Sequence, residues 1–366
     1  MTPDPSTRSN GRPPTLREIA DQAGVHISTA SRVLRQPEPA DGWSDSALRV
    51  RQVAEKLGYQ PNLWAASLRT RKTTTIGVVM PRLTDVVVAT MFQGIEEAAT
   101  AAGYSVLLSS PPDDLDAQRK AVEFLVSRQV DGLMLSSIHL PGTDFVDSLP
   151  LRSLPILLLN RHIDPATSSA NRGLPFVGLP FVSLPFVSGD DRLGGFLAGR
   201  HLLDCGYRDL GVIAGPDHAS TSRERVAGFR DALAEAGLEL PPHRIVASEF
   251  EVQGGVEAAA TLLGGDSRPD AVFTVSDTIA IGVLGVARDL GLSIPDDLAL
   301  VGYNDIPVVS QLPVPLTTVR SPARKIGATG LEHLLALIAG RNVESVKLPV
   351  ELIVRASTRK LAAREL

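Results

Sequence analysis

From residue 73 onward, short uninterrupted runs of Val, Ile and Leu alternate with longer stretches in which apolar residues recur at helical spacing. A run that is apolar at every position is typical of a strand buried on both faces of a parallel sheet. The first series predicts strands at 76–80, 105–108, 132–135 and 156–159, and helices at 91–102 and 116–128. This part of the chain is therefore expected to form a doubly wound α/β lobe.

A second series with the same alternation begins near Gly194. It predicts helices up to 203 and at 224–236, 256–263 and 278–290, with strands at 210–213, 244–247, 271–275 and 299–303. The core is thus expected to contain two doubly wound parallel-sheet lobes. In such lobes ligands bind beyond the carboxyl ends of the strands, and a cleft between two lobes is the default small-molecule site.

The N-terminal segment has a different pattern, that of short amphipathic helices. Thr15 and Glu18 fit a capping box, which marks the start of a helix. Ile19, Ala20 and Ala23 give this helix an apolar stripe. A second helix follows at once, and the sequence predicts an all-α unit ahead of the α/β core.

The second helix has a polar outer face, while Ala30, Val33 and Leu34 can pack inward. The residues expected to point outward are Ile27, Ser28, Thr29, Ser31 and Arg32. Small polar side chains with one Arg suit the major groove of DNA. Any pair of short amphipathic helices shares part of this pattern. The interpretation as a DNA-binding unit therefore depends also on the segment that follows.

A third helix is expected over 48–57, and Pro61 precedes a further short helix at 63–68. Helix, tight turn, helix, third helix and hinge in this order indicate a helix-turn-helix DNA-binding headpiece. The boundaries expected are a disordered tail at 1–13, the headpiece at 14–60, a hinge helix at 61–72 and the core at 73–366. Within the core we expect an N-lobe at about 73–162 plus 322–342, a C-lobe at about 163–321, and a C-terminal strand and tail at 343–366.

Charge is unevenly distributed between these parts. Residues 1–72 hold 11 Lys and Arg against 7 Asp and Glu, whereas the remainder holds 25 against 34. A basic head on an acidic body fits a phosphate-contacting module joined to a core that does not bind nucleic acid, although chance variation in surface charge can give the same contrast.

Cys205 is the only cysteine, so an intramolecular disulfide and a thiolate zinc cluster are excluded. The first 13 residues lack the apolar segment of a secretory signal, and no apolar run approaches the roughly 20 residues of a membrane helix. We therefore expect a cytoplasmic protein that does not contact the membrane and binds no metal or cofactor.

With these features in place, residues 14–71 resemble the DNA-binding headpiece and hinge of the LacI/GalR (lactose repressor) family of bacterial transcriptional regulators. The resemblance continues in matching order through segments 76–81, 94–99, 130–133, 223–229, 302–305 and 315–319. It implies a core of the periplasmic-binding-protein type and an allosteric repressor, controlled by a sugar or sugar derivative bound between the lobes. The expected partners are double-stranded operator DNA and a second copy of the chain.

The resemblance assigns roles in DNA binding. Ile27, Ser28, Thr29 and Arg32 are expected to contact base edges in the major groove, and Thr15, Ser31 and Arg35 to contact phosphates. The hinges of two subunits would pair in the minor groove. The hinge residues involved are Asn62, Ala65 and Leu68, with Leu68 wedged between base steps.

Seven residues match positions that hold effectors in the family. Five follow expected strands, namely Asn160, Arg161, Ser276, Asp277 and Asn304. Arg225 is expected at the start of a helix after the turn Gly215-Pro216, and Phe250 stands where the family often places an aromatic ring against the ligand. Amide, carboxylate and guanidinium groups with one aromatic face suit a polyhydroxylated ring. Singly, such residues also occur as helix caps or turn formers. Asp277 in particular could be a helix N-cap.

Several positions depart from the family pattern. Positions 160 and 304 are Asn where the family commonly has Asp, so the effector is expected to be a neutral sugar or, alternatively, a sugar acid or phosphate. His26 stands where a Ser usually caps the recognition helix; a side-chain nitrogen, a water or fraying of the helix are the alternatives. The connection at 36–43 is longer than usual, and Ala66 replaces a basic hinge residue.

Three near-identical five-residue units follow one another, Leu174 to Gly178, Leu179 to Ser183 and Leu184 to Ser188. One copy suffices to enter the second lobe, and the other two resemble a tandem duplication. The additional copies form either a tolerated surface loop or an apolar projection that contacts a partner or narrows the cleft. Each copy fits the strand position equally well.

An enzymatic function finds no apparatus in the sequence. The seven histidines show no two-His helical spacing, and neither a Gly-x-Ser-x-Gly elbow nor a Walker-type loop occurs. A ligand-independent or architectural DNA-binding protein with a purely dimerising core is the remaining alternative. After the last expected strand, 347–354, the tail is too short for a tetramerising coil, so a homodimer is expected.

Overall fold

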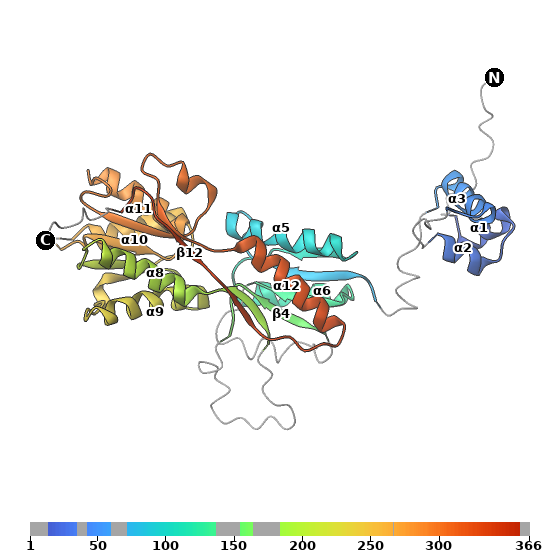
Figure 1. Ribbon diagram of the computed structural model, residues 1–366, viewed down its shortest axis with the longest axis horizontal. Coiled ribbons are helices and arrows are strands. Elements are labelled where there is room, and N and C mark those ends of the chain that lie inside the picture. Colours follow the sequence, from blue (N-terminus) through green and yellow to red (C-terminus); the bar gives the residue numbers. More distant parts are fainter. Residues whose placement is uncertain are drawn as a thin grey trace, which may run out of the picture. The chain divides into compact units, whose positions relative to one another are not determined.

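The computed structural model describes residues 14–34, 42–59, 72–136, 154–163, 184–265 and 267–358. The chain divides into two compact units, Met1–Thr73 and Thr74–Leu366 (Figure 1). Within the described residues, no helix combines the length and the apolar character needed to cross a membrane.

The described residues of the first unit form the helices α1 (Leu16–Ala23), α2 (Ile27–Val33) and α3 (Asp45–Leu57). The capping box predicted at Thr15 and Glu18 is present, because each side chain accepts a hydrogen bond from the other residue's backbone N–H. The left-handed turn after α1 falls at Gly24, which has φ +66°. The expected core is confirmed, and its fully buried members include Ile19, Ala20, Ala30, Val33 and Val50.

The first lobe of the second unit is built on a parallel sheet with the strand order β11-β5-β4-β3-β1-β2. Its strands are β1 (Thr75–Val79), β2 (Ser105–Ser109), β3 (Gly132–Leu135), β4 (Ile156–Leu159), β5 (Phe186–Gly189) and β11 (Val346–Leu348). Residues of β3 and β4 are all buried, as their uninterrupted apolar runs predict.

Helices cover both faces of this sheet. They are α5 (Val86–Ala101), α6 (Leu115–Ser127) and α12 (Ala323–Ile338). Met91 and Ile95 of α5 share one apolar cluster with Ile326 of α12, whereas Val122 and Leu125 of α6 belong to a separate cluster. Figure 1 shows α5 and α12 side by side. Helix α12 thus returns to the first lobe late in the sequence.

The second lobe has the strand order β12-β10-β9-β8-β6-β7, parallel except for β12, which runs antiparallel to β10. Its strands are β6 (Leu210–Ala214), β7 (Ile245–Ala247), β8 (Ala271–Thr274), β9 (Ala299–Asn304), β10 (Thr317–Arg320) and β12 (Glu351–Ile353). Its helices are α8 (Asp191–Asp204), α9 (Ser220–Glu235), α10 (Val252–Leu263) and α11 (Asp277–Asp289), with the 3-10 turns η2 (Pro242–Arg244) and η3 (Pro307–Ser310). The predicted doubly wound class is confirmed for both lobes.

The lobe boundaries differ from the expectation in two places. Strand β5 pairs with β4, so the first lobe does not end near 162 as expected but takes in a strand beyond it. The single strand expected at 347–354 is two strands, β11 in the first sheet and β12 in the second. The chain therefore crosses between the lobes after β5, after β10 and after β11.

The third of the five-residue units forms β5. Val187 is fully buried between the covering helices, and the ring of Phe186 stacks on His162 with 4.4 Å between ring centroids. The first two copies, 174–183, lie outside the described residues. Asp190 follows β5 directly and caps α8, since its side chain accepts a hydrogen bond from the N–H of Leu193. The strand and the helix are therefore joined by a single residue.

Helices α10 and α11 pack closely through glycines, and this contact generates a stability prediction. A Cβ at Gly282 would lie 2.6 Å from the backbone N of Val256 and closer still to the carbonyl oxygen of Val252. We expect Gly282→Ala to lower the free energy of unfolding by about 1–3 kcal/mol, because backbone must move to admit the methyl group.

Gly285→Ala is the matched control in the same helix, since a Cβ there meets nothing within 4 Å. We expect it to leave stability unchanged or raise it by up to about 1 kcal/mol through helix propensity. Urea unfolding followed by circular dichroism measures both. Equal effects of the two substitutions would contradict the proposed packing constraint.

Candidate functional site

The outward face of α2 is the first candidate site. Ile27, Ser28 and Arg32 are exposed, with 41% of Ile27 accessible, and Thr29 and Ser31 are half-buried. Ala30 and Val33 hold the helix against α1 and α3. The helix therefore presents short polar side chains, one apolar side chain and one guanidinium, which is the surface that the sequence predicts.

His26 caps α2 with a side-chain nitrogen, the first of the alternatives left open by the sequence. Its Nδ1 accepts a hydrogen bond from the backbone N–H of Ser28 at 3.3 Å and lies 2.7 Å from the Ser28 hydroxyl. The Thr15 hydroxyl is engaged in the cap of α1. Four residues of the predicted DNA contact, Arg35, Asn62, Ala65 and Leu68, lie outside the described residues.

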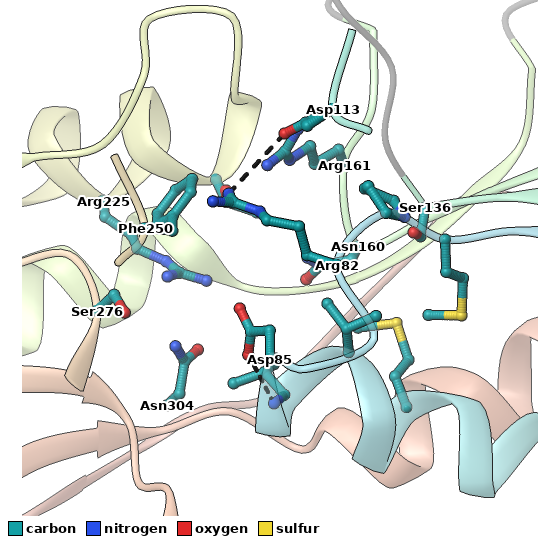
Figure 2. A pocket seen from close by; sticks show the side chains of 16 residues that line it. Arg82, Asp85, Asp113, Ser136, Asn160, Arg161, Arg225, Phe250, Ser276 and Asn304 are labelled. Atoms are coloured by element: carbon teal, nitrogen blue, oxygen red, sulfur yellow. Dashed lines mark hydrogen bonds and ion pairs between the residues drawn. The ribbon is translucent and has the colours of Figure 1, made fainter. Parts of the chain in front are cut away.

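The second candidate site is a cleft within the core, with an empty volume of about 590 Å³. Its lining comes from the carboxyl ends of strands in both lobes, where a doubly wound fold is expected to bind ligands. The lining residues are Met80, Pro81, Arg82, Asp85, Val87, Val88, Met91, Asp113, Ser136, Asn160, Arg161, Thr221, Arg225, Phe250, Ser276 and Asn304. Figure 2 shows their polar side chains converging from several elements.

Six of the seven residues predicted to bind an effector line this cleft: Asn160, Arg161, Arg225, Phe250, Ser276 and Asn304. Asp277 does not. Its carboxylate is fully buried, accepting hydrogen bonds from the Thr318 hydroxyl at 2.6 Å and from the N–H of Ile306 at 2.9 Å. Asp277 is also not the N-cap of α11, because Ser276 has that role. Asp277 is therefore a buried link between α11, the loop after β9 and strand β10.

Sequence reasoning missed the polar residues that the first lobe contributes, namely Arg82, Asp85, Asp113 and Ser136. Each lies just beyond a predicted strand, in the loop after β1, β2 or β3. Asn160 was predicted because it directly follows a strand of the parallel sheet. The same argument applies to these loops, so the sequence could have predicted that they line the cleft. Met80, Val88 and Met91 add an apolar wall, opposite which Phe250 supplies the one aromatic ring of the lining.

Arg225 is held rigidly in the wall of the cleft. It lies in the second turn of α9 and is 4% exposed, with Nε donating to Asp191 at 2.7 Å and Nη1 donating to the carbonyl of Val275 at 2.7 Å. Its guanidinium carbon lies 3.7 Å from the ring centroid of Tyr303. Burial alone would lower the pKa of Arg225, but the adjacent Asp191 carboxylate raises it overall, so the guanidinium stays charged.

Arg161 forms a second cationic group, close to the aromatic ring. Its Nη1 donates to Asp113 Oδ2 at 3.3 Å, and its guanidinium carbon lies 5.7 Å from the ring centroid of Phe250. Burial lowers the pKa of Arg161, and the charge of Asp113 opposes that shift. Arg82 links the lobes at the mouth of the cleft, because its Nη1 donates to Glu251 of the second lobe at 3.1 Å.

Asn160 and Asn304 share an unusual backbone conformation. Their φ angles are +65° and +109°, in the region that Asn tolerates better than most residues. Asn at these two positions thus has a backbone reason in addition to any ligand contact. Both amides stand at the carboxyl end of a strand, one in each lobe, and both border the cleft.

Comparison with known proteins agrees with both sites. Residues 15–62 match the family model described as bacterial regulatory proteins, lacI family, and residues 200–358 match the periplasmic binding protein-like domain. Over 332 residues the chain is 32% identical to the ribose operon repressor of Haemophilus influenzae, covering 90% of this chain and 93% of the relative. The chain belongs to the lacI family of bacterial regulatory proteins.

Solved structures extend the match over nearly the whole chain. The lac repressor dimer bound to operator and the anti-inducer ONPF has a TM-score of 0.82 and 25% identity, covering 95% of this chain and 99% of that one. The CelR–cellobiose complex has a TM-score of 0.68 and 29% identity, covering 94% and 99%. This LacI-family protein is a DNA-binding transcriptional repressor and not an enzyme.

The buried carboxyl group of Asp277 generates a pH prediction. Desolvation raises its pKa from 3.8 to about 7, against the opposing effect of the Thr318 hydrogen bond. Between those two pH values the folded protein keeps a proton that the unfolded chain has released. The resulting stability is complete at low pH and is lost as the pH rises through about 7.

Asp277→Asn removes this titration while keeping the size of the side chain. Relative to the variant, we expect the wild-type protein to lose up to about 4 kcal/mol of unfolding free energy between about pH 4 and pH 7, at about 1.4 kcal/mol per pKa unit. Urea unfolding by circular dichroism at several pH values measures this, with the exposed Asp289→Asn as control. Parallel pH profiles of wild type and Asp277→Asn would contradict the assignment.

Proposed function

We propose that this LacI-family protein represses transcription through α2 bound in the major groove of an operator, under the control of a sugar-like effector in the cleft. The observation that carries the proposal is the combination of two sites in one chain. An exposed helix of short polar side chains precedes a core whose cleft is lined by both lobes. In this arrangement an effector and DNA can influence each other's binding.

The chemistry of the cleft supports a sugar or sugar derivative as the effector. Amide groups of Asn160 and Asn304, the Ser276 hydroxyl and the Arg225 guanidinium offer donors and acceptors in several directions. Phe250 and the methionines offer apolar contact for the flat face of a ring. The CelR relative was solved with cellobiose, which is consistent with this class of ligand.

We propose that the protein acts as a homodimer on a pseudo-palindromic operator, with paired hinges in the minor groove as in the family it belongs to. Two headpieces would then occupy successive major grooves. Unstacking a base step costs a few kcal/mol, so binding would require both hinges at the correct spacing. The lac repressor relative was solved as a dimer bound to operator.

Effector binding would change the angle between the lobes and thereby the separation of the hinges. In the described part of the chain the lobes are joined after β5, after β10 and after β11, so a change in the angle between the lobes bends these connections. A coupling free energy of about 1–3 kcal/mol, or roughly 5- to 150-fold in operator affinity, is usual for such linkage. Its sign distinguishes an inducer from a corepressor.

The DNA-binding part of the proposal predicts a specific loss at Arg32. We expect Arg32→Ala to weaken binding to a selected operator by about tenfold or more, because one contact to base edges contributes about 1–3 kcal/mol of discrimination. Fluorescence anisotropy at fixed salt, using duplexes selected from a palindrome pool, measures it. Arg49→Ala, which removes an exposed positive charge from α3, is the matched control. Equal losses for the two variants would show a general charge effect and count against base reading by α2.

The effector part predicts a loss of sugar response at Phe250. A panel of neutral and acidic sugars is first tested for a shift in operator affinity. For the responding sugar, we expect Phe250→Ala to weaken the response by about tenfold through loss of ring stacking, while operator binding without sugar is unchanged. Phe124→Ala, an exposed ring on α6 outside the cleft, is the control. If no sugar shifts operator affinity, the ligand-independent regulator is favoured instead.

A further inference from the structure

Each arginine that lines the cleft already has a carboxylate partner within the protein. The pairs are Arg225 with Asp191 at 2.7 Å, Arg161 with Asp113 at 3.3 Å and Arg82 with Glu251 at 3.1 Å. Asp85 also borders the cleft, and no basic side chain in the described part of the chain forms an ion pair with it. The three cations are therefore balanced by three carboxylates, and Asp85 leaves one negative charge in excess.

Asp113 occupies a position in which four donors surround one carboxylate. Its Oδ2 accepts from Arg161 and lies 4.0 Å from Nη2 of Arg82 and 3.7 Å from Nε2 of His218. Its Oδ1 accepts from Nε2 of Gln118 at 3.1 Å, and Gln118 is 2% exposed. Figure 2 shows Arg82 and Arg161 both reaching toward Asp113 at one side of the cleft. Such a cluster would hold a phosphate or carboxylate of a ligand if Asp113 were not in it.

We propose that Asp113 is a specificity-determining residue that fills the anion position of the cleft, so that the cleft accepts an uncharged polyhydroxylated effector and rejects sugar acids and sugar phosphates. The inference rests on the proposed function, in which this cleft is the effector site. An entering anion must displace a carboxylate that accepts hydrogen bonds from Arg161 and Gln118 and lies 4.0 Å from Nη2 of Arg82, and it meets no net positive charge in return.

A neutral sugar does not face this obstacle. A guanidinium carries five N–H donors, so an arginine paired with one carboxylate oxygen keeps donors for a hydroxyl group. Asp85 accepts the N–H of Val87 with Oδ1, and its second oxygen can accept from a sugar hydroxyl. The paired arginines thus act as directional hydrogen-bond donors. This resolves the choice left open by the sequence in favour of the neutral ligand.

The test replaces Asp113 by Asn and uses inorganic phosphate as the probe. Asn keeps the size of the side chain and an oxygen that can accept from Gln118 or Arg161, but it removes the charge. In isothermal titrations of the full chain, we expect no saturable phosphate binding by the wild type. Asp113→Asn should bind phosphate saturably, at least about tenfold more tightly than the weakest affinity that the wild-type titration can detect, which is the effect of a charge-assisted contact. In the double variant with Arg161→Met this gain should disappear, which locates it in the cleft.

Asp116→Asn is the matched control, since it removes an exposed carboxylate from the first turn of α6, the helix that follows Asp113. The proposal is overturned if Asp116→Asn gains as much as Asp113→Asn, if the wild type binds phosphate as tightly as the variant, or if folded Asp113→Asn gains nothing. Should Asp113→Asn fail to fold, Asp113→Ser provides the second test, because it removes the same carboxylate from beside Arg161 and Arg82. A phosphate gain is then expected there, and its absence overturns the proposal.

This experiment contains neither DNA nor sugar, so its failure is distinguishable from failure of the proposed function. If operator binding responds to a neutral sugar while the Asp113→Asn variant binds no phosphate, the proposed function stands and the role assigned to Asp113 is wrong. Conversely, if Asp113→Asn gains phosphate binding but no sugar changes operator affinity, the role assigned to Asp113 is supported and the proposal of a sugar effector is contradicted.

Discussion

The ion pair between Arg225 and Asp191 is the interaction on which the arrangement of the cleft depends. Both residues are buried, and the pair joins α9 to the first turn of α8. A buried cation without its partner is strongly destabilising, whereas the pair itself adds little net stability. The pair therefore acts mainly by fixing the orientation of the Arg225 guanidinium. The hydrogen bond to the carbonyl oxygen of Val275 and the contact with the Tyr303 ring restrict that orientation further.

That constraint explains the glycines around the pair. A Cβ at Gly194 would lie 2.6 Å from Cε2 of Tyr303, and a Cβ at Gly195 would lie 2.7 Å from the carbonyl carbon of Arg225. Helix α8 must therefore approach both Tyr303 and α9 without side chains at these two positions. Gly194 and Gly195, three and four residues after Asp191, thus allow the close approach of α8 that brings the Asp191 carboxylate within hydrogen-bonding distance of Arg225.

Sequence patterning predicted the fold well because central strands of both lobes, such as β3, β4 and β8, are buried along their whole length and apolar at nearly every position. It located Asn160, Arg161, Ser276 and Asn304 through one rule, that polar residues just beyond parallel strands meet at the same edge of the sheet. Arg225 and Phe250 were expected from the positions that hold effectors in the family. The rule failed at Asp277, which differs from Ser276 by one position. Periodicity does not say which of two neighbouring side chains at a strand–helix junction faces the cleft and which turns inward to Thr318. The β11–β12 division was also missed, although Pro349, which lies between the two strands, marks the break in the extended run.

The repeated five-residue unit is a second case in which the strand pattern alone does not decide the structure, whereas the residues that follow the strand do. The three copies are indistinguishable as strands, because each offers the same Leu-Pro-Phe-Val run. What distinguishes the third copy is its successor: Gly189 ends β5, and Asp190 immediately caps α8. A strand joined to its helix by one residue cannot be replaced by an earlier copy without inserting at least five residues at a lobe crossing. Since that crossing also carries Asp191 into contact with Arg225, the short connection ties the choice of strand to the geometry of the cleft.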